Sequence, residues 1–502
     1  MPLAHNFQKE PEFHNKLMTF LSIRQKCLSL PRVKHKALYY CFRSNKYVEM
    51  REPYRVRWRD VAALIEAVLK AEAIKPAQQA KREAFKDFGI LGTRRDPPLT
   101  SIFYGIMLRL GIIDKVIEDL TGSKSPFLLD PRLRSALRVF IYLEVYARGR
   151  VTYERKLECL KRTAAWLSSR SHPYVGMWFI DAVKSLSTYT PTPKTPDEEL
   201  MYKYLLPAWY VRRIFELVGE SEADKILKSF IEKPKISVRV NILKASVQEV
   251  LEKLKAEGKN PEVSKVVPTV IRFEGPYNFD KSELFKSGKI VIQEEPAALA
   301  ALILNPRPGD VVVDLAAAPG GKTEHMGELM RNQGVIHAFD INKARMRRLE
   351  ELVKRAGVTI VKTYVKDGRE APKVVGEEVA DRVLVDAPCT SDGTLAKNPD
   401  LRWRLMEDEV AKLSQLQYEL LKAALKLVKP GGYILYTTCT LLSEENEEVI
   451  KRLLDKEGKK VRLVPLEGPY DRGFLPGTMR VWPHIHKTIG FFYALLQKVD
   501  RS

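Results

Sequence analysis

The chain has 502 residues, more than one hydrophobic core usually supports, so we expect about two to four domains. Its 45% hydrophobic and 29% charged residues exclude a disordered or fibrous protein. The 84 Lys and Arg residues outnumber the 63 Asp and Glu residues and leave a net charge of +21, which favours a polyanionic partner, either nucleic acid or an anionic membrane surface.

The sequence also argues against a membrane, secreted or metal-binding protein. Apolar runs such as Ala297 to Leu304 are far shorter than the roughly 18 to 20 residues of a spanning helix, and the N-terminus lacks the pattern of a secretory signal. The five cysteines are too scattered for a disulfide framework, and no Cys-x-x-Cys pair or His-rich cluster predicts a metal site. We therefore expect a cytoplasmic protein with free thiols, no metal and no membrane partner.

Residues 1–55 form a basic, weakly patterned N-terminal extension. They predict either an RNA-contacting arm or a dispensable extension. Met50 stands just before the first well-patterned segment, which is compatible with a start codon placed too far upstream. Both alternatives stay open.

Residues 56–187 have the periodicity of successive amphipathic helices. Apolar residues recur at helical spacing in Val61 to Ala71, and the stretches Ile102 to Leu120 and Pro131 to Tyr146 repeat the pattern. We expect a compact helical domain here.

Residues 188–200 are predicted to be an extended Pro-rich linker, because the prolines from Pro191 to Pro196 cannot continue a helix. Residues 201–290 then predict a small α+β module. Its strand-like runs are Ile236 to Leu243 and Val266 to Phe273, and a helical pattern covers Val247 to Leu254.

Residues 291–502 change to short Val/Ile/Leu-rich runs that alternate with helical patterns, which is typical of a parallel, doubly wound sheet. A late run, Phe491 to Leu496, predicts an antiparallel strand at the far side of that sheet. The five parallel runs begin at Val311, Val335, Ile360, Arg382 and Tyr433.

The loop Asp314 to Thr323 follows the first of these strands. Its small residues let a ligand approach the backbone, and amides at the start of the next helix can bind a polar or negative group. The end of the loop, Gly321 to Thr323, matches a phosphate-binding P-loop, but Ala316 stands where that motif needs glycine and Pro319 lies inside it. The loop therefore argues against a nucleoside triphosphatase.

Acidic residues at later strand ends favour another ligand. Asp340 ends the second strand, where a carboxylate commonly accepts hydrogen bonds from ribose hydroxyls. Asp367 follows the third strand and Asp386 ends the fourth. Taken singly, each residue fits a cap or turn. Together with the loop, they converge on one crevice and favour S-adenosylmethionine (SAM).

Two cysteines follow neighbouring strands. Cys389 lies just past the fourth strand and Cys439 just past the fifth, both in polar loops. Because neighbouring strand ends lie about 5 Å apart, both thiols can face the same crevice. A free cysteine is usually a small buried apolar residue, but such cysteines lie mostly within helices or strands.

These motifs resemble the Sun/Fmu (Nop/Sun) family of RNA cytosine-5 methyltransferases. The likeness covers about residues 200–495 and includes Arg239 to Asn241 and Gln293 to Pro296. The family usually has cysteine where this chain has Ala316, a position that is not catalytic. The helical region is similar to the NusB-type RNA-binding domain of the small-subunit rRNA methylase branch.

The resemblance implies a multidomain protein. It predicts an α/β Rossmann-like SAM-dependent methyltransferase domain, preceded by the small α+β module, which would bind RNA, and by an all-α NusB-like domain. SAM is the implied cofactor, rRNA the implied partner, and a monomer is expected. The residues expected to hold SAM are Ala316, Ala317, Ala318, Pro319, Gly320, Gly321, Lys322, Asp340, Asp367 and Asp386.

The resemblance also assigns catalytic roles. Cys439 would attack carbon 6 of a cytosine, and Cys389 would assist product release. Asp386 would hydrogen-bond the cytosine edge, and Lys322 would be a cationic helper near the base. Covalent catalysis suits this reaction because carbon 5 of cytosine is by itself a poor nucleophile.

Several functions remain as alternatives. The chain could methylate tRNA instead of small-subunit rRNA, or be a non-catalytic RNA-binding factor in ribosome assembly. An ATP-dependent RNA enzyme would need an intact phosphate loop. DNA methylation is disfavoured, because common DNA cytosine methylases take their nucleophile from the fourth-strand Pro-Cys, whereas this chain offers Cys439 as a second candidate.

Overall fold

The structure is a computed structural model that describes residues 53–170 and 172–499. The basic extension, residues 1–55, lies almost entirely outside these ranges, as do Cys27 and Cys41. The chain divides between Ala208 and Trp209 into two compact units.

The first unit is helical, as the periodicity predicts. It also contains a short parallel pair of strands, β1 and β2. Its elements are β1 Tyr54–Val56, α2 Trp58–Ala73, α3 Ala77–Asp87, α4 Asp96–Leu108, α5 Leu110–Thr121, η2 Pro126–Leu128, α6 Pro131–Ile141, the π-helical turn η3 Tyr142–Tyr146, β2 Val151–Tyr153, α7 Lys156–Arg170, α8 Pro173–Ser185 and α9 Pro196–Tyr204.

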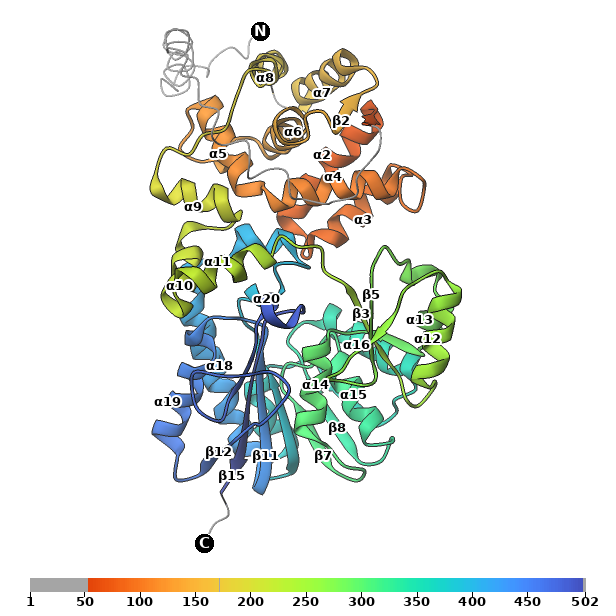
Figure 1. Cartoon of the computed structure of the whole chain (residues 1–502), viewed down its shortest axis with the longest axis vertical. Helices are drawn as coiled ribbons and strands as arrows, with labels where there is room; N and C mark the ends of the chain where they lie inside the picture. Colours follow the sequence, from red (N-terminus) through yellow and green to blue (C-terminus); the bar gives the residue numbers. More distant parts are fainter. Residues whose placement is uncertain (1–52, 171, 500–502) are drawn as a thin grey trace, which may run out of the picture. The chain divides into compact units, whose positions relative to one another are not determined.

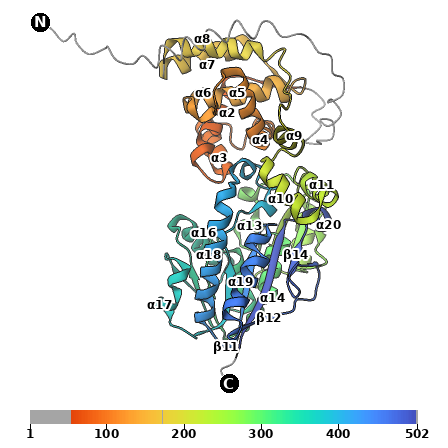
Figure 2. The same ribbon diagram turned by 90° about the vertical axis from the view of Figure 1, so that its left-hand side faces the viewer.

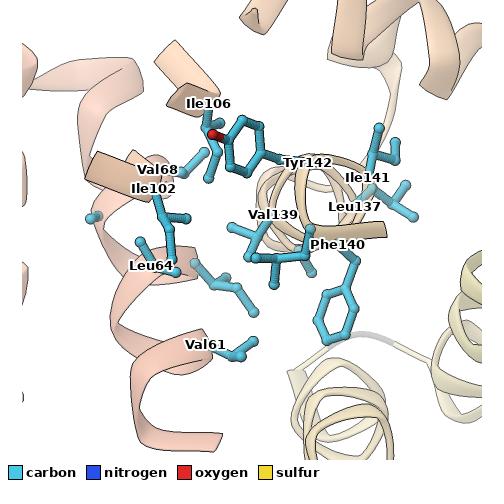
Figure 3. Close-up of a cluster of buried hydrophobic side chains, with 14 of the residues drawn as sticks. Val61, Leu64, Val68, Ile102, Ile106, Leu137, Val139, Phe140, Ile141 and Tyr142 are labelled. Carbon is cyan, nitrogen blue, oxygen red and sulfur yellow. The ribbon is translucent and has the colours of Figure 1, made fainter. Parts of the chain in front are cut away.

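The core of the helical unit lies around α6. Figure 3 shows Val61 and Leu64 of α2 pointing toward Val139 and Phe140 of α6, with Ile106 of α4 nearby. Every one of these side chains is fully buried. Each such burial contributes about 1.5–3 kcal/mol relative to exposure, so this contact holds α2, α4 and α6 together.

Helix α6 also carries two buried arginines that are fully paired. Arg138 donates to Asp114 at 2.7 Å and to Glu72 at 2.5 Å, and Arg134 donates to Glu72 at 2.7 Å. The helix starts where Asp130 accepts hydrogen bonds from the amides of its first turn. These ion pairs fix α6 against α2 and α5.

Two predictions about this unit need correction. The stretch Ile102 to Leu120 is not one helix, because the backbone leaves helical geometry at Arg109 and separates α4 from α5. The predicted linker is too long: α9 begins at Pro196, where Thr195 caps the amide of Glu198. Although prolines precede it, this segment has the features of a helix start. A threonine caps the first turn, a proline stands in that turn, and three acidic residues favour the N-terminal end of a helix.

The second unit begins with two helices and a four-stranded antiparallel sheet in the order β4-β5-β3-β6. The predicted α+β content is confirmed, but a boundary at residue 290 cuts through β6, which pairs with β3. The elements are α10 Ala208–Val218, α11 Glu220–Ser229, β3 Ile236–Val240, α12 Val247–Ala256, β4 Glu262–Val263, β5 Val270–Phe273, η4 Phe279–Lys281, α13 Glu283–Lys286 and β6 Ile290–Ile292.

A nine-stranded sheet forms the rest of the unit. Its strands are β7 Val311–Asp314, β8 Val335–Phe339, β9 Val361–Tyr364, β10 Ala380–Asp386, β11 Val428–Thr438, β12 Val461–Val464, β13 Asp471–Arg472, β14 Met479–Val481 and β15 Phe491–Lys498. The helical elements between them are α14 Glu295–Leu304, α15 Gly321–Leu329, α16 Lys343–Ala356, η5 Gly368–Glu370, α17 Ala371–Val375, η6 Asp392–Thr394, η7 Pro399–Arg404, α18 Glu407–Leu427, η8 Ser443–Glu445, α19 Glu447–Glu457 and α20 Pro483–His486.

The order of strands places a topological switch point between β7 and β10. The parallel part runs β9-β8-β7-β10-β11, so the chain passes from β7 to β8 and β9 on one side and then crosses to β10 and β11 on the other. Ligands of doubly wound folds bind at such a switch point, beyond the carboxyl ends of the strands. β15 is antiparallel to β11, as predicted, but it is not the last strand, because β12 and β14 also pair with it.

Helices cover both faces of this sheet. α18 and α19 pack on one face, and α14 and α15 pack on the other (Figure 1). In the turned view α18 and α19 again lie side by side in front of the sheet (Figure 2). Within the described ranges, no helix is long and apolar enough to cross a membrane.

A buried arginine ties the four-stranded sheet to the nine-stranded one. Arg239 of β3 is completely buried and pairs with Glu324 and Glu328 of α15, the latter at 2.6 Å. Its Nε also donates to Gln293 at 2.6 Å. Asn241 adds two bonds, to the carbonyls of Gly288 and Ala356. The two sheets therefore form one compact unit.

We predict that Arg239→Met lowers the free energy of unfolding of this unit by about 3–5 kcal/mol, because Glu324 and Glu328 would remain buried without their cation. Urea unfolding followed by tryptophan fluorescence measures the change. Arg462→Met is the control, since this exposed arginine on β12 bonds Gln497 at 2.7 Å and should cost less than about 0.5 kcal/mol. Equal costs would contradict the prediction.

Candidate active site

The sequence motifs meet at the switch point of the sheet. Asp314 ends β7 and Asp386 ends β10, and these two strands are hydrogen-bonded neighbours. Cys439 follows β11, the next strand. The structure thus brings these residues to neighbouring strand ends at one edge of the sheet.

The loop between β7 and α15 is shaped by Gly320. This residue has φ +107°, and a Cβ there would lie 2.8 Å from Cγ of Leu349, so glycine alone fits without strain. The turn leaves the first amides of α15 without a side-chain cap. Thr323 fastens the helix to β7 by donating to Asp314 at 2.7 Å, and burial raises the pKa of Asp314 to about 7.

Asp340 faces this loop from the end of β8. It accepts hydrogen bonds from the amide of Ala318 at 3.2 Å and from that of Asn342 at 2.8 Å. Arg345 lies 3.5 Å from the same carboxylate. The structure therefore brings Asp340 beside the glycine-rich loop.

Asp367 lies after the end of β9, and its carboxylate is hydrogen-bonded within the protein. It caps η5 through the amide of Arg369, and the guanidinium of Arg369 pairs with it at 2.7 Å. These bonds lower the pKa of Asp367. The neighbouring Gly368 packs so closely that a Cβ would lie 2.2 Å from the carbonyl oxygen of Leu315, which holds the β9 end against β7.

Lys322 and Asp386 form an ion pair inside the crevice. The lysine Nζ lies 2.7 Å from one carboxylate oxygen, and Thr437 donates to the other at 2.8 Å. The same Nζ lies 5.3 Å from the centre of the Phe491 ring. A fixed cation beside a carboxylate can stabilise charge that develops on a bound base.

The two predicted cysteines lie in contact. Sγ of Cys389 and Sγ of Cys439 are 3.5 Å apart, and both side chains are partly exposed. The hydrogen bond from Cys389 lowers the pKa of Cys439, whereas the same contact and burial raise the pKa of Cys389 well above its usual value. The contact therefore favours ionisation of Cys439 over that of Cys389.

Two glycines fix the Cys439 backbone. Gly393 donates its amide to the carbonyl of Cys439 at 2.9 Å, and Gly490 donates to the carbonyl of Gly393 at 2.8 Å. A Cβ on Gly393 would lie 2.5 Å from the carbonyl oxygen of Gly490. The segment just before β15 therefore holds the Cys439 backbone in place through Gly490 and Gly393.

A buried polar network behind Cys389 was not predicted from the sequence. Glu445 accepts a bond from the hydroxyl of Thr390 at 2.6 Å, and Tyr210 donates to Asp392 at 2.6 Å. The acidic run that includes Glu445, a few residues after Cys439, was the available signal. The partners could not be found from it, because Tyr210 and Asp392 are separated by 182 positions.

The crevice fits SAM on observations of this structure. The uncapped backbone amides at the start of α15 can donate hydrogen bonds to the polar methionine part of SAM, and Asp340 can accept a hydrogen bond from a ribose hydroxyl. Two exposed apolar side chains follow the adjoining strands, Ile341 with 73% and Val365 with 48% of its surface exposed. An apolar wall next to a carboxylate suits a purine nucleoside.

Family comparisons agree with this geometry. Residues 301–497 match the family described as 16S rRNA methyltransferase RsmB/F. Residues 206–280 match the RsmF/B-like ferredoxin-like domain, which corresponds to α10 to η4 and includes strands β3 to β5.

Three similar proteins extend the likeness. One from Bacillus subtilis, named probable ribosomal RNA small subunit methyltransferase B, is 28% identical over 88% of this chain and 98% of its own. A Synechocystis protein of the same name is 36% identical over 59% of this chain and 67% of its own. The crystal structure of PH0851 is 50% identical, covers 89% of this chain and all of its own, and superposes with a TM-score of 0.83.

The paired cysteines, the loop at the end of β7 and these matches agree on one assignment. The chain belongs to the RsmB/F family of SAM-dependent methyltransferases.

Proposed function

We propose that this protein transfers a methyl group from SAM to carbon 5 of a cytosine in small-subunit rRNA, through a covalent cysteine–cytosine intermediate. The observation that carries the proposal is the contact of Cys389 and Cys439 at 3.5 Å, beside the Lys322–Asp386 pair. The relatives named for small-subunit rRNA support the choice of substrate.

The residues from Ala316 to Lys322, together with Asp340, Asp367 and Asp386, would hold the cofactor. SAM supplies an electrophilic methyl carbon. Asp340 is already fixed beside the loop by its bond to the amide of Ala318, so it would accept a hydrogen bond from a ribose hydroxyl without moving. Asp367 would bind the adenine side of the cofactor by exchanging some of its bonds to Arg369.

Cys439 would act first, as a thiolate that adds to carbon 6 of cytosine. The new sulfur–carbon bond would move electron density to carbon 5, which would then bond to the methyl carbon as the bond between that carbon and the SAM sulfur breaks and S-adenosylhomocysteine leaves. Loss of the proton from carbon 5 breaks the sulfur–carbon bond and returns the Cys439 thiolate. Cys389 lies against the same sulfur and would assist this release.

Asp386 and Lys322 would hold the base. Asp386, carrying a proton when it contacts the ring nitrogen, would hydrogen-bond the cytosine edge. Lys322, whose Nζ lies 2.7 Å from the Asp386 carboxylate, would stabilise the electron-rich adduct. Thr437 fixes the carboxylate in place.

RNA binding would involve several parts of the chain. The helical unit would act as a NusB-like RNA-binding domain, the four-stranded sheet as a second RNA-binding module, and residues 1–55 as a basic arm. The target base must leave its stack to reach the crevice, so locally opened RNA is the substrate we expect. We expect a cytoplasmic monomer.

The cysteine roles predict two different failures. Cys439→Ala should reduce methyl transfer by about 10³-fold or more, because no thiolate can add to carbon 6. Cys389→Ala should instead accumulate a covalent RNA–protein species, because release is slowed. Incubation with a small-subunit rRNA transcript and methyl-labelled SAM, followed by a denaturing gel, separates the two outcomes.

Cys159→Ala is the matched control for that experiment. Cys159 is a free, buried cysteine of α7 in the helical unit, so methyl transfer should not change. If the covalent species appears with Cys439→Ala instead, the two roles are exchanged. If both active-site variants retain activity, the covalent mechanism is wrong.

The net charge of +21 predicts a strong salt dependence of RNA binding. Contact with four or more phosphates gives a slope of log affinity against log salt of about −3 or steeper on single-stranded RNA. Fluorescence anisotropy at several salt concentrations measures this slope. A slope near zero would contradict phosphate-based binding.

The substrate itself can be identified in cells. Bisulfite sequencing of total RNA with and without the gene should show one small-subunit rRNA cytosine that loses its protection. Loss of protection in tRNA would favour a tRNA methyltransferase. No change at any cytosine, together with no SAM binding by calorimetry, would favour a non-catalytic assembly factor.

A further inference from the structure

The two active-site cysteines are free thiols in contact with each other. Sγ of Cys389 lies 3.5 Å from Sγ of Cys439, although the two residues are 50 positions apart in the chain. Both side chains are partly exposed, so a small molecule in solution can reach them. The pair is therefore open to chemistry in which both sulfurs take part.

A bond between these sulfurs would need only a short movement. The sulfurs of a disulfide are about 2.05 Å apart, so the present gap would close by about 1.5 Å. The backbone on each side is held in place. Gly393 donates its amide to the carbonyl of Cys439 at 2.9 Å. The amide of Thr390 donates to Glu445 at 3.1 Å. Rotation of the two side chains would therefore bring the sulfurs together, with both loops left where they are.

The two thiols suit the two steps of an oxidation by a peroxide. A thiolate reacts with the peroxide, and a neighbouring thiol then resolves the product. The hydrogen bond from Cys389 lowers the pKa of Cys439, whereas the same contact and burial raise the pKa of Cys389. Cys439 is therefore favoured as the sulfur that reacts with the oxidant, and Cys389 is the protonated thiol within reach of it.

Cys159, the other cysteine in the described part of the chain, differs from this pair. Its side chain is buried in α7, and burial raises its pKa to about 11. A buried thiol that stays protonated is inert. Among the described cysteines, oxidation should thus be confined to Cys389 and Cys439.

We propose that Cys389 and Cys439 form a site of reversible oxidative modification, in which hydrogen peroxide converts the two thiols into a disulfide and switches methyl transfer off. The loss of methyl transfer rests on the proposed function, because a disulfide sulfur cannot add to carbon 6 of cytosine. The modification itself rests on the contact of the two sulfurs.

The oxidation has two steps. In the first, the Cys439 thiolate attacks one oxygen of hydrogen peroxide, the oxygen–oxygen bond breaks, and hydroxide leaves and takes up the proton that Cys439 lost on ionisation. In the second, the Cys389 sulfur attacks the sulfur of the resulting sulfenic acid, the sulfur–oxygen bond breaks, and water leaves with the Cys389 proton. The two thiols are oxidised by two electrons, and the peroxide is reduced to two molecules of water.

Cys389 has a protective role in this scheme. A sulfenic acid without a resolving thiol is oxidised further to sulfinic and sulfonic acids, which ordinary thiols do not reduce. A disulfide, in contrast, returns to two thiols by exchange with a dithiol reductant. The contact with Cys389 therefore preserves Cys439 until the reductant is available again.

The test treats the reduced full-length protein with hydrogen peroxide and maps its tryptic peptides by mass spectrometry without reduction. Cys389 and Cys439 fall in different tryptic peptides, and neither peptide contains another cysteine. We expect these two peptides to become joined at least about tenfold faster than Cys159 is oxidised, since the thiolate is the reactive form. Methyl transfer should fall in step with the joined peptides, and dithiothreitol should restore both.

Cys389→Ser tests the protective role. After peroxide and then dithiothreitol, Cys439 of this variant should remain as sulfinic or sulfonic acid, whereas Cys439 of the parent should return to the thiol. Cys159→Ala is the matched control, and its two active-site peptides should join at the parent rate. Circular dichroism melting establishes that each variant is folded.

Two results would overturn the inference. One is oxidation of Cys439 to sulfinic acid in the parent with no joined peptides. The other is joining that is no faster than the oxidation of Cys159. Both are measured on the unaltered chain, so neither depends on the folding of a variant. Joined peptides with undiminished methyl transfer would instead confirm the modification and contradict the proposed role of Cys439 as nucleophile.

Discussion

The buried cation of Arg239 is the constraint on which the catalytic unit depends. It places a strand of the small sheet against α15, the helix whose first turn carries Gly321 and Lys322. A charge with no access to water has to be paired, so the position of α15 follows from the position of β3. Because Lys322 lies in the first turn of α15, its orientation toward Asp386 depends on the pairing of Arg239 with Glu324 and Glu328. The small sheet thus sets where Lys322 lies.

Asp314, Asp386, Cys389 and Cys439 could be placed from the sequence because of one rule of geometry. Parallel strands end at the same edge, so residues just past consecutive apolar runs meet there without knowledge of any side-chain contact. The doubly wound core followed from the same runs and is present in the structure, and the family match supports the assignment. The specific roles of the cysteines remain a proposal.

Features that arise from contacts distant in sequence were not predictable in this way. The end of the linker was misplaced because the prolines before Thr195 obscured a capped helix start. β6 was divided by a predicted boundary because a three-residue strand is defined by its partner β3 and not by its own composition. Glu445 was missed for a related reason, since an acid in a polar loop shows its burial only when Gln417 and Thr390 are packed around it.

The position of β15 has a consequence for how the enzyme is made. This strand comes late in the chain, yet it lies inside the sheet between β11 and β14, and Gly490 just before it closes the Cys439 loop. During synthesis the two active-site cysteines, the loop before α15 and the helices on both faces of the sheet leave the ribosome before β15 does. The Cys439 loop therefore lacks the contact that Gly490 provides until almost the whole described chain has emerged.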